Sequence, residues 1–313
     1  MKLHIKLGLA LACTAWMASN GAQAQSVTTT LGSNWDFTAT GGTDGGAFTG
    51  SCESSPASLL SDAQSTDGDS DMYDNAWGIW VDGVPLSGAI TTSGSTASVA
   101  AQTLSGLSVS ADYLFSDTIE AFRLLANFTN PTGSPLSVTV EVPANFGSDS
   151  GTALVSTSSG DTSFTTADNW AQTWDGSSEI NTSVFYLPGG ALTPSAYTET
   201  VFDCSGTQGL GATFPLTVPA NSTRRLMFFA GIAEIDGTGS TDTANATANA
   251  QQFNSFASID SSLTADLSPT ALSETVNVSG ALPAPPTPVP ALPLSLLVLL
   301  AGGLGGFALR KLK

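Results

Sequence analysis

The sequence predicts an all-β body, folded as an antiparallel β-sandwich or a large assembly of two sheets, with one or two short helices near its C-terminal end. A separate transmembrane helix is expected after the body. Apolar and polar residues alternate with a period of two in several segments, which is typical of strands with one buried face. Turn residues recur between these segments. Few segments carry the 3.6-residue apolar stripe of an amphipathic helix.

The clearest strand is residues 136–142, where leucine and valines alternate with Ser, Thr and Glu. A hairpin is expected at residues 76–86, because the dipeptide Asp82-Gly83 favours a type I′ turn between two apolar runs. Residues 219–222 have turn composition and separate the last two strands. Further strands are expected at residues 107–115, 119–128, 183–187, 214–218 and 225–235.

Two helices are expected near the end of the body. Thr241 has the residue type of an N-cap for a helix over residues 242–256. Ser268 has the same role for a short helix that begins at Pro269, because proline is favoured at the first helical position. This second helix is expected to run to Val276.

The charge distribution excludes several function classes. The chain has 313 residues, 26 acidic and 8 basic, and a formal net charge of −18. Five basic residues lie at the two ends, so the body keeps Arg123, Arg224 and Arg225 against all 26 acids, a balance of −23. The body has no lysine, and the only histidine is His4. Nucleic-acid binding, histidine-dependent catalysis, histidine metal ligation and lysine Schiff-base chemistry are therefore not expected of it.

The N-terminus has the three parts of a signal peptide. Lys2 and Lys6 give the positive start, and residues 7–17 form a short apolar run. The tripeptide Ala-Gln-Ala provides a cleavage site directly before Gln25. Lipoprotein processing at Cys13 is the alternative. Either route predicts export through the inner membrane.

The C-terminus also has three parts. A proline-rich stretch is typical of a stiff, extended spacer. A run of 16 residues without charge follows. As a helix it would span about 24 Å, slightly less than the ~30 Å hydrocarbon core. The basic end is expected to stay cytoplasmic. The predicted organisation is a signal peptide (1–24), a secreted body (25–280), a proline-rich linker with a sorting motif (281–293), a transmembrane helix (294–309) and a basic tail (310–313).

The order of a short proline-containing motif, an apolar helix and a basic tail resembles the C-terminal sorting signals of Gram-negative bacteria of the PEP-CTERM type and its IPTL-CTERM relatives. The resemblance implies an exosortase-type membrane transpeptidase or protease as a partner, and transfer of the body to the cell surface. The alternative is a plain single-pass anchor. The residues similar to an Ile-Pro-Thr-Leu motif are Val289, Pro290, Ala291 and Leu292.

The body resembles uncharacterised bacterial secreted proteins that carry such tails. The resemblance implies a fold and a location, and no activity. It lies in the segments 130–132, 146–149, 157–161 and 168–170.

The mature chain keeps two cysteines, Cys52 and Cys204. A cysteine pair in an exported protein predicts a disulfide, because the compartment is oxidising. The alternative is two buried free thiols. A nucleophilic role is not expected, since the body has neither histidine nor lysine to activate a thiolate.

The densest acidic cluster is a candidate calcium site. Carboxylates spaced by two residues in a turn can place several oxygens around one Ca²⁺. The EF-hand pattern is not met, because Met72 stands where its glycine belongs and Gly78 where its glutamate belongs. Asp62 and Asp82 are expected helpers, and a solvated acidic loop is the alternative. The four candidate ligands are Asp67, Asp69, Asp71 and Asp74.

Four tryptophans form a candidate carbohydrate-binding surface. Sugar rings stack on flat aromatic faces while nearby polar groups bind the hydroxyls. The alternative is that these side chains fill the core, as tryptophan often does. The residues are Trp77, Trp80, Trp170 and Trp174.

The sequence thus predicts a noncatalytic structural or adhesive protein, exported and sorted to the cell surface or extracellular matrix of a Gram-negative bacterium. Calcium-assisted association with an anionic polysaccharide is the expected interaction, because an acidic surface otherwise repels like-charged surfaces. A carbohydrate-binding module is the alternative. A carboxylate-dependent glycosidase is the third class, and it requires two acids in one cleft. The ligand, the oligomeric state and the fate of the tail stay open.

Overall fold

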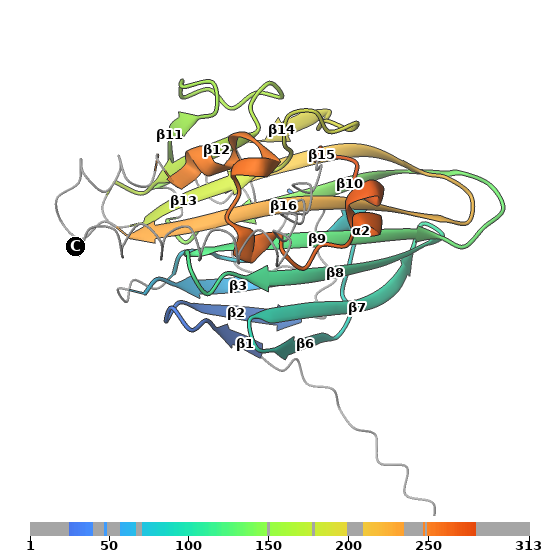
Figure 1. The fold of residues 1–313 in the computed structure, drawn as a ribbon, viewed down its shortest axis with the longest axis horizontal. Helices are drawn as coiled ribbons and strands as arrows, with labels where there is room; N and C mark the ends of the chain where they lie inside the picture. Colours follow the sequence, from blue (N-terminus) through green and yellow to red (C-terminus); the bar gives the residue numbers. More distant parts are fainter. Residues whose placement is uncertain are drawn as a thin grey trace, which may run out of the picture.

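The body is mostly antiparallel β-sheet with few, short helices, which confirms this part of the predicted fold (Figure 1). A computed structural model describes residues 25–39, 47–48, 57–66, 71–148, 151–176, 179–198, 209–234, 247 and 249–279. The strands are β1 (Gln25–Thr28), β2 (Asn34–Ala39), β3 (Ser58–Gln64), β4 (Trp80–Val81), β5 (Val84–Pro85), β6 (Ile90–Ser93), β7 (Thr96–Leu104), β8 (Leu107–Phe115), β9 (Ala121–Asn130), β10 (Leu136–Asn145), β11 (Ala153–Thr157), β12 (Trp170–Trp174), β13 (Glu179–Val184), β14 (Ala196–Thr198), β15 (Gly209–Val218) and β16 (Ser222–Glu234).

The strands form three sheets. The largest has eight strands in the order β11-β12-β13-β16-β9-β8-β7-β6. The second has five strands in the order β14-β15-β10-β4-β5, and the third is the N-terminal sheet β1-β2-β3. Long hairpins such as β8–β9, paired from Ser108↔Thr129 to Phe115↔Phe122, set the register over most of the large sheet. Every pairing between these named strands is antiparallel.

One large apolar core joins the three sheets. It takes side chains from one face of β8, β9 and β16 together with the inward side chains of β10, β15 and β2. Phe122 lies at its centre. Neighbouring aromatic rings in the group around it have centroids 5.0–6.5 Å apart. We call the face of the eight-stranded sheet that meets this core the inner face. Its close-packed aromatic side chains fix how the smaller sheets lie on the large one.

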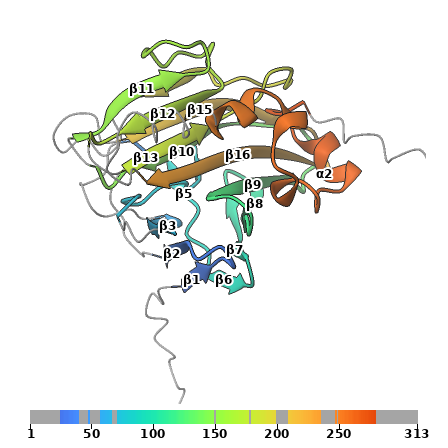
Figure 2. The ribbon, with the colours of Figure 1, turned by 60° about the vertical axis from the view of Figure 1, so that its left-hand side comes forward.

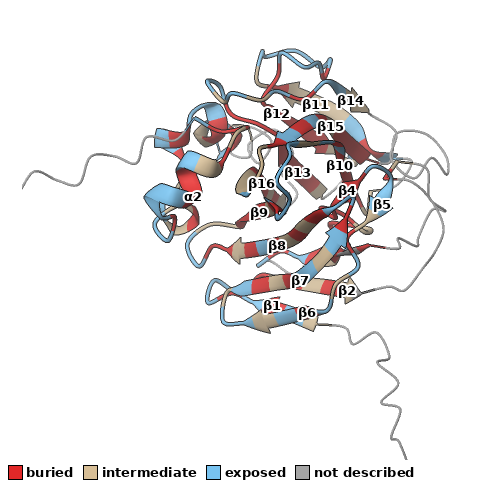
Figure 3. Ribbon diagram, turned by 90° about the vertical axis from the view of Figure 1, so that its right-hand side faces the viewer, coloured by how far each residue is buried: buried red, intermediate tan, exposed pale blue. Residues whose placement is uncertain are grey.

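The opposite face of the eight-stranded sheet, which we call the outer face, is covered by residues 249–279. We call this segment the C-terminal strap, and Figures 1 and 2 show it in orange across the outer face. It buries a second apolar cluster against β9, β12, β13 and β16. Strands β9 and β16 are therefore buried on both faces over most of their length (Figure 3). The strap contains the short helices η2 (Gln251–Asn254), η3 (Phe256–Ser258), η4 (Ser261–Leu263) and α2 (Pro269–Glu274).

The helix predicted over residues 242–256 is confirmed at residues 247, 249 and 250, which are α-helical, and is wrong after them. Residues 251–258 form two successive 3₁₀ turns instead. Phe253, Phe256 and Ile259 are all buried against the sheet. Ser255 between the two turns is extended, with φ −154° and ψ 156°, so the chain does not continue as one helix. Burial of these three side chains on the sheet outweighs the local preference for a regular helix.

The short helix after Ser268 is confirmed. The Ser268 hydroxyl accepts a hydrogen bond from the Ala271 N–H at 3.0 Å, and Pro269 occupies the first turn. The helix ends at Glu274, two residues earlier than predicted. Thr275 forms a parallel bridge with Arg225 of β16 instead, so the chain leaves the helix to join the sheet.

The predicted hairpin at residues 76–86 is shorter than expected. Strand pairing is limited to β4 and β5, joined by Asp82 and Gly83, which both have positive φ as a type I′ turn requires.

The tail lies outside the described residues, and so do the signal peptide and the predicted transmembrane helix 294–309. No helix in the described ranges is long and apolar enough to cross a membrane.

Candidate functional site

A cavity of about 380 Å³ lies at the edge of the strap, where it meets the ends of β13 and β16. Three separate parts of the chain enclose it. The eight-stranded sheet gives the floor, the start of the strap gives one wall, and the β8–β9 connection gives the other, together with residues next to the N-terminal sheet. This size falls within the range of small-molecule sites.

The floor of the cavity is a row of small side chains across three neighbouring strands. Thr182 on β13 is paired with Gly231 on β16, and Gly231 is paired in turn with Ala121 on β9. All three line the cavity. A Cβ atom built on Gly231 would come no closer than 3.5 Å to any other atom. The missing side chain therefore leaves usable space rather than relieving a clash.

The strap forms one wall through Asn249, Gln252 and the aromatic ring of Phe253. Side chains from β12 and the loop before it fix this wall. The Asn169 amide donates a hydrogen bond to the Phe253 carbonyl at 2.6 Å, and the Trp170 indole N–H donates to the Asn254 side-chain oxygen at 2.8 Å. The two amide side chains on the wall can each donate and accept hydrogen bonds.

The opposite wall carries the carboxylate of Glu120, with Thr66, Thr118 and Leu31 beside it. Glu120 lies in the short connection between β8 and β9. Its backbone carbonyl accepts a hydrogen bond from the Ile232 N–H at 3.0 Å, which ties the connection to β16. Its side-chain oxygen Oε1 accepts a hydrogen bond from the backbone N–H of Thr66 at 2.5 Å. The carboxylate is therefore held in one orientation at the cavity.

The surroundings of the cavity are negative. Thr118 donates a hydrogen bond to Asp260 at 3.2 Å, and the neighbouring Asp117 accepts one from the Thr30 N–H at 2.7 Å. The pKa of Asp117 is lowered, chiefly by that backbone hydrogen bond. Hydrogen bonds from the side chain and backbone of Ser262 lower the pKa of Asp260. Both groups are therefore ionised at neutral pH.

Arg123 is buried near the cavity, and its charge is already paired. It donates to both carboxylate oxygens of Asp266, at 2.7 and 2.8 Å, and to the Leu263 carbonyl at 2.5 Å. This hydrogen-bonded pair lowers the pKa of Asp266. The ion pair holds the middle of the strap on β9. Among the described residues, no lysine, arginine or histidine lines the cavity.

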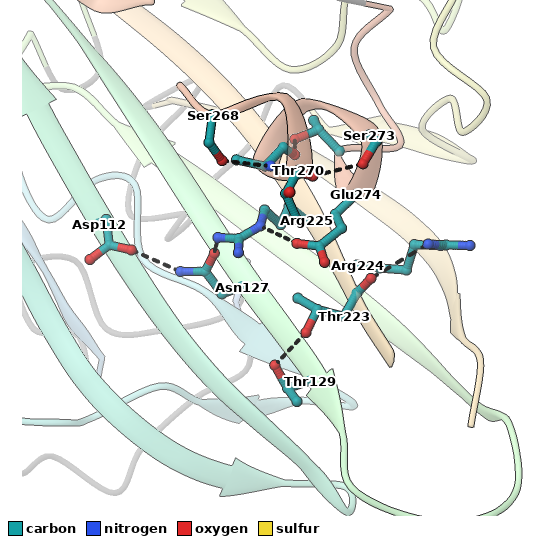
Figure 4. A network of polar contacts seen from close by, with 12 residues as sticks. Asp112, Asn127, Thr129, Thr223, Arg224, Arg225, Ser268, Thr270, Ser273 and Glu274 are labelled. Atoms are coloured by element: carbon teal, nitrogen blue, oxygen red, sulfur yellow. Dashed lines mark hydrogen bonds and ion pairs between the residues drawn. The ribbon is translucent and has the colours of Figure 1, made fainter. Parts of the chain in front are cut away.

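A second polar network lies farther along the outer face and has a structural role (Figure 4). Arg225 donates to Glu274 of helix α2 at 2.9 Å and to the side-chain oxygen of Asn127. Asn127 donates in turn to Asp112 at 2.8 Å. Each residue of this network has a partner of opposite charge or a polar partner, and the network holds α2 on the sheet.

The predicted tryptophan surface is wrong. Trp77 and Trp80 are fully buried, and Trp170 is 3% exposed. Trp174 is half-buried and packs against Ile180. The alternative, that these side chains fill the core, accounts for Trp77, Trp80 and Trp170. Other elements cover both faces of β12 and also cover the loop before β4.

The structure describes only some of the residues of the predicted calcium site. Asp67 and Asp69 lie outside the described residues. Asp71 donates its backbone N–H to the carboxylate of Asp62, the predicted helper, at 3.1 Å. Burial raises the pKa of Asp62, and the nearby charges of Asp71 and Asp36 add to this. In the described ranges, no group of three histidine, cysteine, aspartate or glutamate residues could hold a metal ion. Calcium binding stays a prediction.

The other predicted sites lie outside the described residues. These are Cys52 and Cys204 of the predicted disulfide, and the sorting motif over residues 289–292. Asp82, the second predicted calcium helper, accepts a hydrogen bond from the Thr139 N–H at 2.8 Å and stabilises the β4–β5 turn.

The residues that line the cavity were missed by the sequence analysis. Glu120 was not distinguishable from the other 25 acids, and Gln252 was placed within a predicted helix. One signal was available. Gly231 interrupts the apolar run of a predicted strand, and a glycine there often marks a place where something approaches the backbone closely.

Three solved structures are similar to parts of the chain. A candidate kojibiose phosphorylase from the human microbiome is 13% identical, covers 58% of this chain and 26% of its own, and has a TM-score of 0.35. A candidate aldose 1-epimerase from Escherichia coli K12 is 6% identical and has a TM-score of 0.42. The match covers 69% of this chain and 100% of the epimerase chain. Another candidate aldose 1-epimerase, from Klebsiella pneumoniae subsp. pneumoniae, is 8% identical and has a TM-score of 0.39. The match covers 72% of this chain and 82% of the epimerase chain. No protein-family model and no curated protein matches the chain.

These neighbours contradict what the sequence predicted about activity. All three bear the names of enzymes that act on sugars, whereas the sequence predicted a noncatalytic structural or adhesive protein and no enzyme. We correct both expectations. The neighbours also lend no support to the features of a secreted, sorted surface protein. Because their TM-scores are below 0.5, the function proposed below rests on the cavity and not on them.

Proposed function

We propose that this chain binds a small, hydroxyl-rich molecule of the sugar or polyol class in the cavity beneath the strap. One observation carries the proposal. A row of small side chains, Thr182, Gly231 and Ala121, leaves a hollow in an otherwise close-packed sheet, and polar side chains surround it. A well-packed sheet face has few voids larger than a water molecule, so a hollow of this size with polar walls fits a ligand.

The chemistry of the walls supports this ligand class. Threonine hydroxyls, two amide side chains and one carboxylate offer donors and acceptors within one small space. Phe253 and Ile119 add apolar surface against which the carbon skeleton of a sugar can pack. A mostly apolar molecule would remove water from these polar groups and offer no hydrogen bonds in exchange, at a cost of roughly 1–3 kcal/mol for each group that loses a hydrogen bond.

The glycosidase interpretation does not fit this cavity. That reaction requires two carboxyl groups on either side of the scissile bond. Of the described residues that line the cavity, one carries a carboxylate, Glu120. We therefore propose ligand binding at this site.

We further infer that the five- and eight-stranded sheets together form a β-sandwich, and that the body is exported. Their shared apolar core supports the first inference. The positive start, the apolar run and the Ala-Gln-Ala site of the N-terminus support the second. Intact-mass analysis of the protein from its native cell tests export, because a mass that retains residues 1–24 would contradict it.

Titration calorimetry with glucose, galactose, N-acetylglucosamine and glycerol tests the proposed function. The variant Gly231→Val should lose binding at least tenfold, because its methyl groups project into the hollow while its Cβ meets only ordinary contacts. Gly231→Ala is the matched control and should retain binding. Equal affinity of the valine variant and the wild type, or no binding of any compound to the wild type, would contradict the proposal.

A further inference from the structure

We propose that the body holds a second binding site, an internal chamber on the inner face of the eight-stranded sheet that binds water molecules. The chamber lies between β13 and the segment 72–77, which precedes β4. It is separate from the cavity beneath the strap. Thr182 lines that cavity from the outer face, whereas its neighbours Asn181 and Ser183 face the inner core, as their partners on β16 do.

The first support is a group of buried polar atoms on β12 and β13. Thr173 lies directly opposite Asn181 in the strand register, and Ser183 is the next residue of β13 on the same face. All three are at most 1% exposed. Within the described part of the chain, their two hydroxyls and the Asn181 side-chain oxygen have no hydrogen-bond partner. Buried polar atoms in folded proteins nearly always have one, either in the protein or in ordered water.

The second support is that the segment 72–77 lies directly beneath these atoms. The Asn181 amide donates a hydrogen bond to the Met72 carbonyl at 3.2 Å, which turns its side-chain oxygen away from that bond. The Trp77 ring stacks on Phe185, with centroids 5.3 Å apart. The two ends of the segment therefore contact β13 and the residue that follows it. Ser183 lies between these two contacts.

The segment contributes two further buried polar groups, the Tyr73 hydroxyl and the Trp77 indole N–H. Both side chains are fully buried, and neither group makes a well-formed hydrogen bond with a residue that the structure describes. Burial raises the pKa of the Tyr73 hydroxyl, and the Trp77 N–H offsets part of this rise. The two groups are therefore close together without a direct bond, an arrangement that a bridging water satisfies.

The third support is the combination of space and chemistry around Ser183. Its partners in the register are Ala171 on β12 and Ala230 on β16, so small side chains flank it on both sides. A buried water requires a polar site with two to four partners. Hydroxyls both donate and accept, the Asn181 oxygen accepts, and the Trp77 N–H donates, so these groups can bond water completely. None of them carries a charge, which favours water over an ion.

The sign of a stability change tests the proposal. Thr173→Val removes one hydroxyl and keeps the shape of the side chain. If that hydroxyl is bonded to water, the melting temperature should fall by about 2–4 °C relative to the control, because one hydrogen bond is lost. Removal of a hydroxyl without a partner should instead raise it. Thr139→Val, at an exposed position on β10, is the matched control for the preference of strands for valine. A rise, or a change equal to that of the control, would overturn the inference.

A high-resolution crystal structure of the wild-type protein decides the question if Thr173→Val does not fold. We expect ordered water within hydrogen-bond distance of Tyr73, Thr173 and Ser183. Direct hydrogen bonds among these side chains with no water between them, or a different molecule in the chamber, would overturn the inference. Each of these outcomes leaves the proposed function intact, because its site lies on the opposite face of the sheet.

Discussion

The two faces of the eight-stranded sheet are covered in different ways. On the inner face the cover consists of other sheets, whose backbone groups are bonded to one another in regular ladders. On the outer face the cover is the strap, which has only short helical turns. The inner face is filled with interlocking aromatic rings, whereas the outer face combines an apolar cluster, buried polar side chains and the cavity.

The difference shows how a cover without ladders is held in place. The backbone hydrogen bonds within the strap are local ones inside its turns, so side chains provide much of the polar bonding between the strap and the sheet. Asn277 is the clearest case. Its amide donates to the carbonyls of Phe185 and Met227, and its oxygen accepts from the Met227 N–H. Such a cover need not follow the sheet closely everywhere, and the hollow above Gly231 lies at its edge.

The largest expected effect is on the inner face. Phe122→Ala should reduce the free energy of unfolding by about 3–5 kcal/mol, because the ring is fully buried among four other aromatic side chains and its loss leaves a cavity. Denaturant unfolding measures this. Val84→Ala, at a position 47% exposed, is the control and should change stability by less than about 0.5 kcal/mol. A small loss for Phe122→Ala would mean that the inner face is not the tighter of the two.

The next effect is on the anchor of the strap. Asn277→Ala should cost about 3 kcal/mol, because it leaves three buried backbone groups without partners. Hydrogen exchange should show faster opening of residues 269–278 than in the wild type. Ser273→Ala, on the exposed side of α2, is the matched control and should leave exchange of the strap nearly unchanged. Equal exchange in the two variants would show that Asn277 does not hold the strap.

Acid should release the strap through Asp266. Its folded pKa lies below the ordinary value because Arg123 donates to the charged carboxylate. The pair therefore stabilises the fold fully above the unfolded pKa near 3.9, and this contribution is lost as the pH falls through the lower folded value. We expect Asp266→Asn to cost about 1 kcal/mol at neutral pH, because the Asp266 side chain is 55% exposed and solvent weakens the pair, and to flatten this part of the acid dependence. An unchanged acid profile in unfolding measurements would contradict the assignment.

The smallest effect is expected at the network shown in Figure 4. Arg225 and Glu274 are each about one quarter exposed, so water and salt weaken their attraction. Glu274→Gln should cost no more than about 1 kcal/mol, and less at high salt. A loss as large as that of Asn277→Ala would show that charge, rather than buried backbone hydrogen bonding, fastens the strap to the outer face.

The strands were the most predictable part of the fold. Residues 136–142 alternate strictly, residues 107–113 alternate until Leu114, and both segments are strands. The run over residues 225–235 was also predicted as a strand, although it does not alternate. Its apolar residues are continuous because β16 is buried by the core on one face and by the strap on the other. The sequence did not indicate which element provides the second cover.

The helices and the site were less predictable, for physical reasons. An α-helix and a 3₁₀ helix share the same local preferences. At Phe253, Phe256 and Ile259 the structure has two 3₁₀ turns separated by the extended Ser255, and burial of the three side chains on the sheet decided between the two kinds of helix. The tryptophans illustrate the same limit, because their ring faces suit both a sugar and a core. Only the layers above and below β4 and β12 decided for the core.

By itself, the amino-acid sequence determined the antiparallel β-structure, the Ser268 cap and the lack of lysine and histidine in the body, because alternation, capping and charge are local or compositional properties. The tertiary structure decided where a ligand could fit. Thr182, Gly231 and Ala121 are about 50 residues or more apart in the chain and meet only through strand pairing. Glu120, Thr66 and Gln252 surround them because the strap and the N-terminal sheet fold back onto that edge. No local pattern records such long-range contacts.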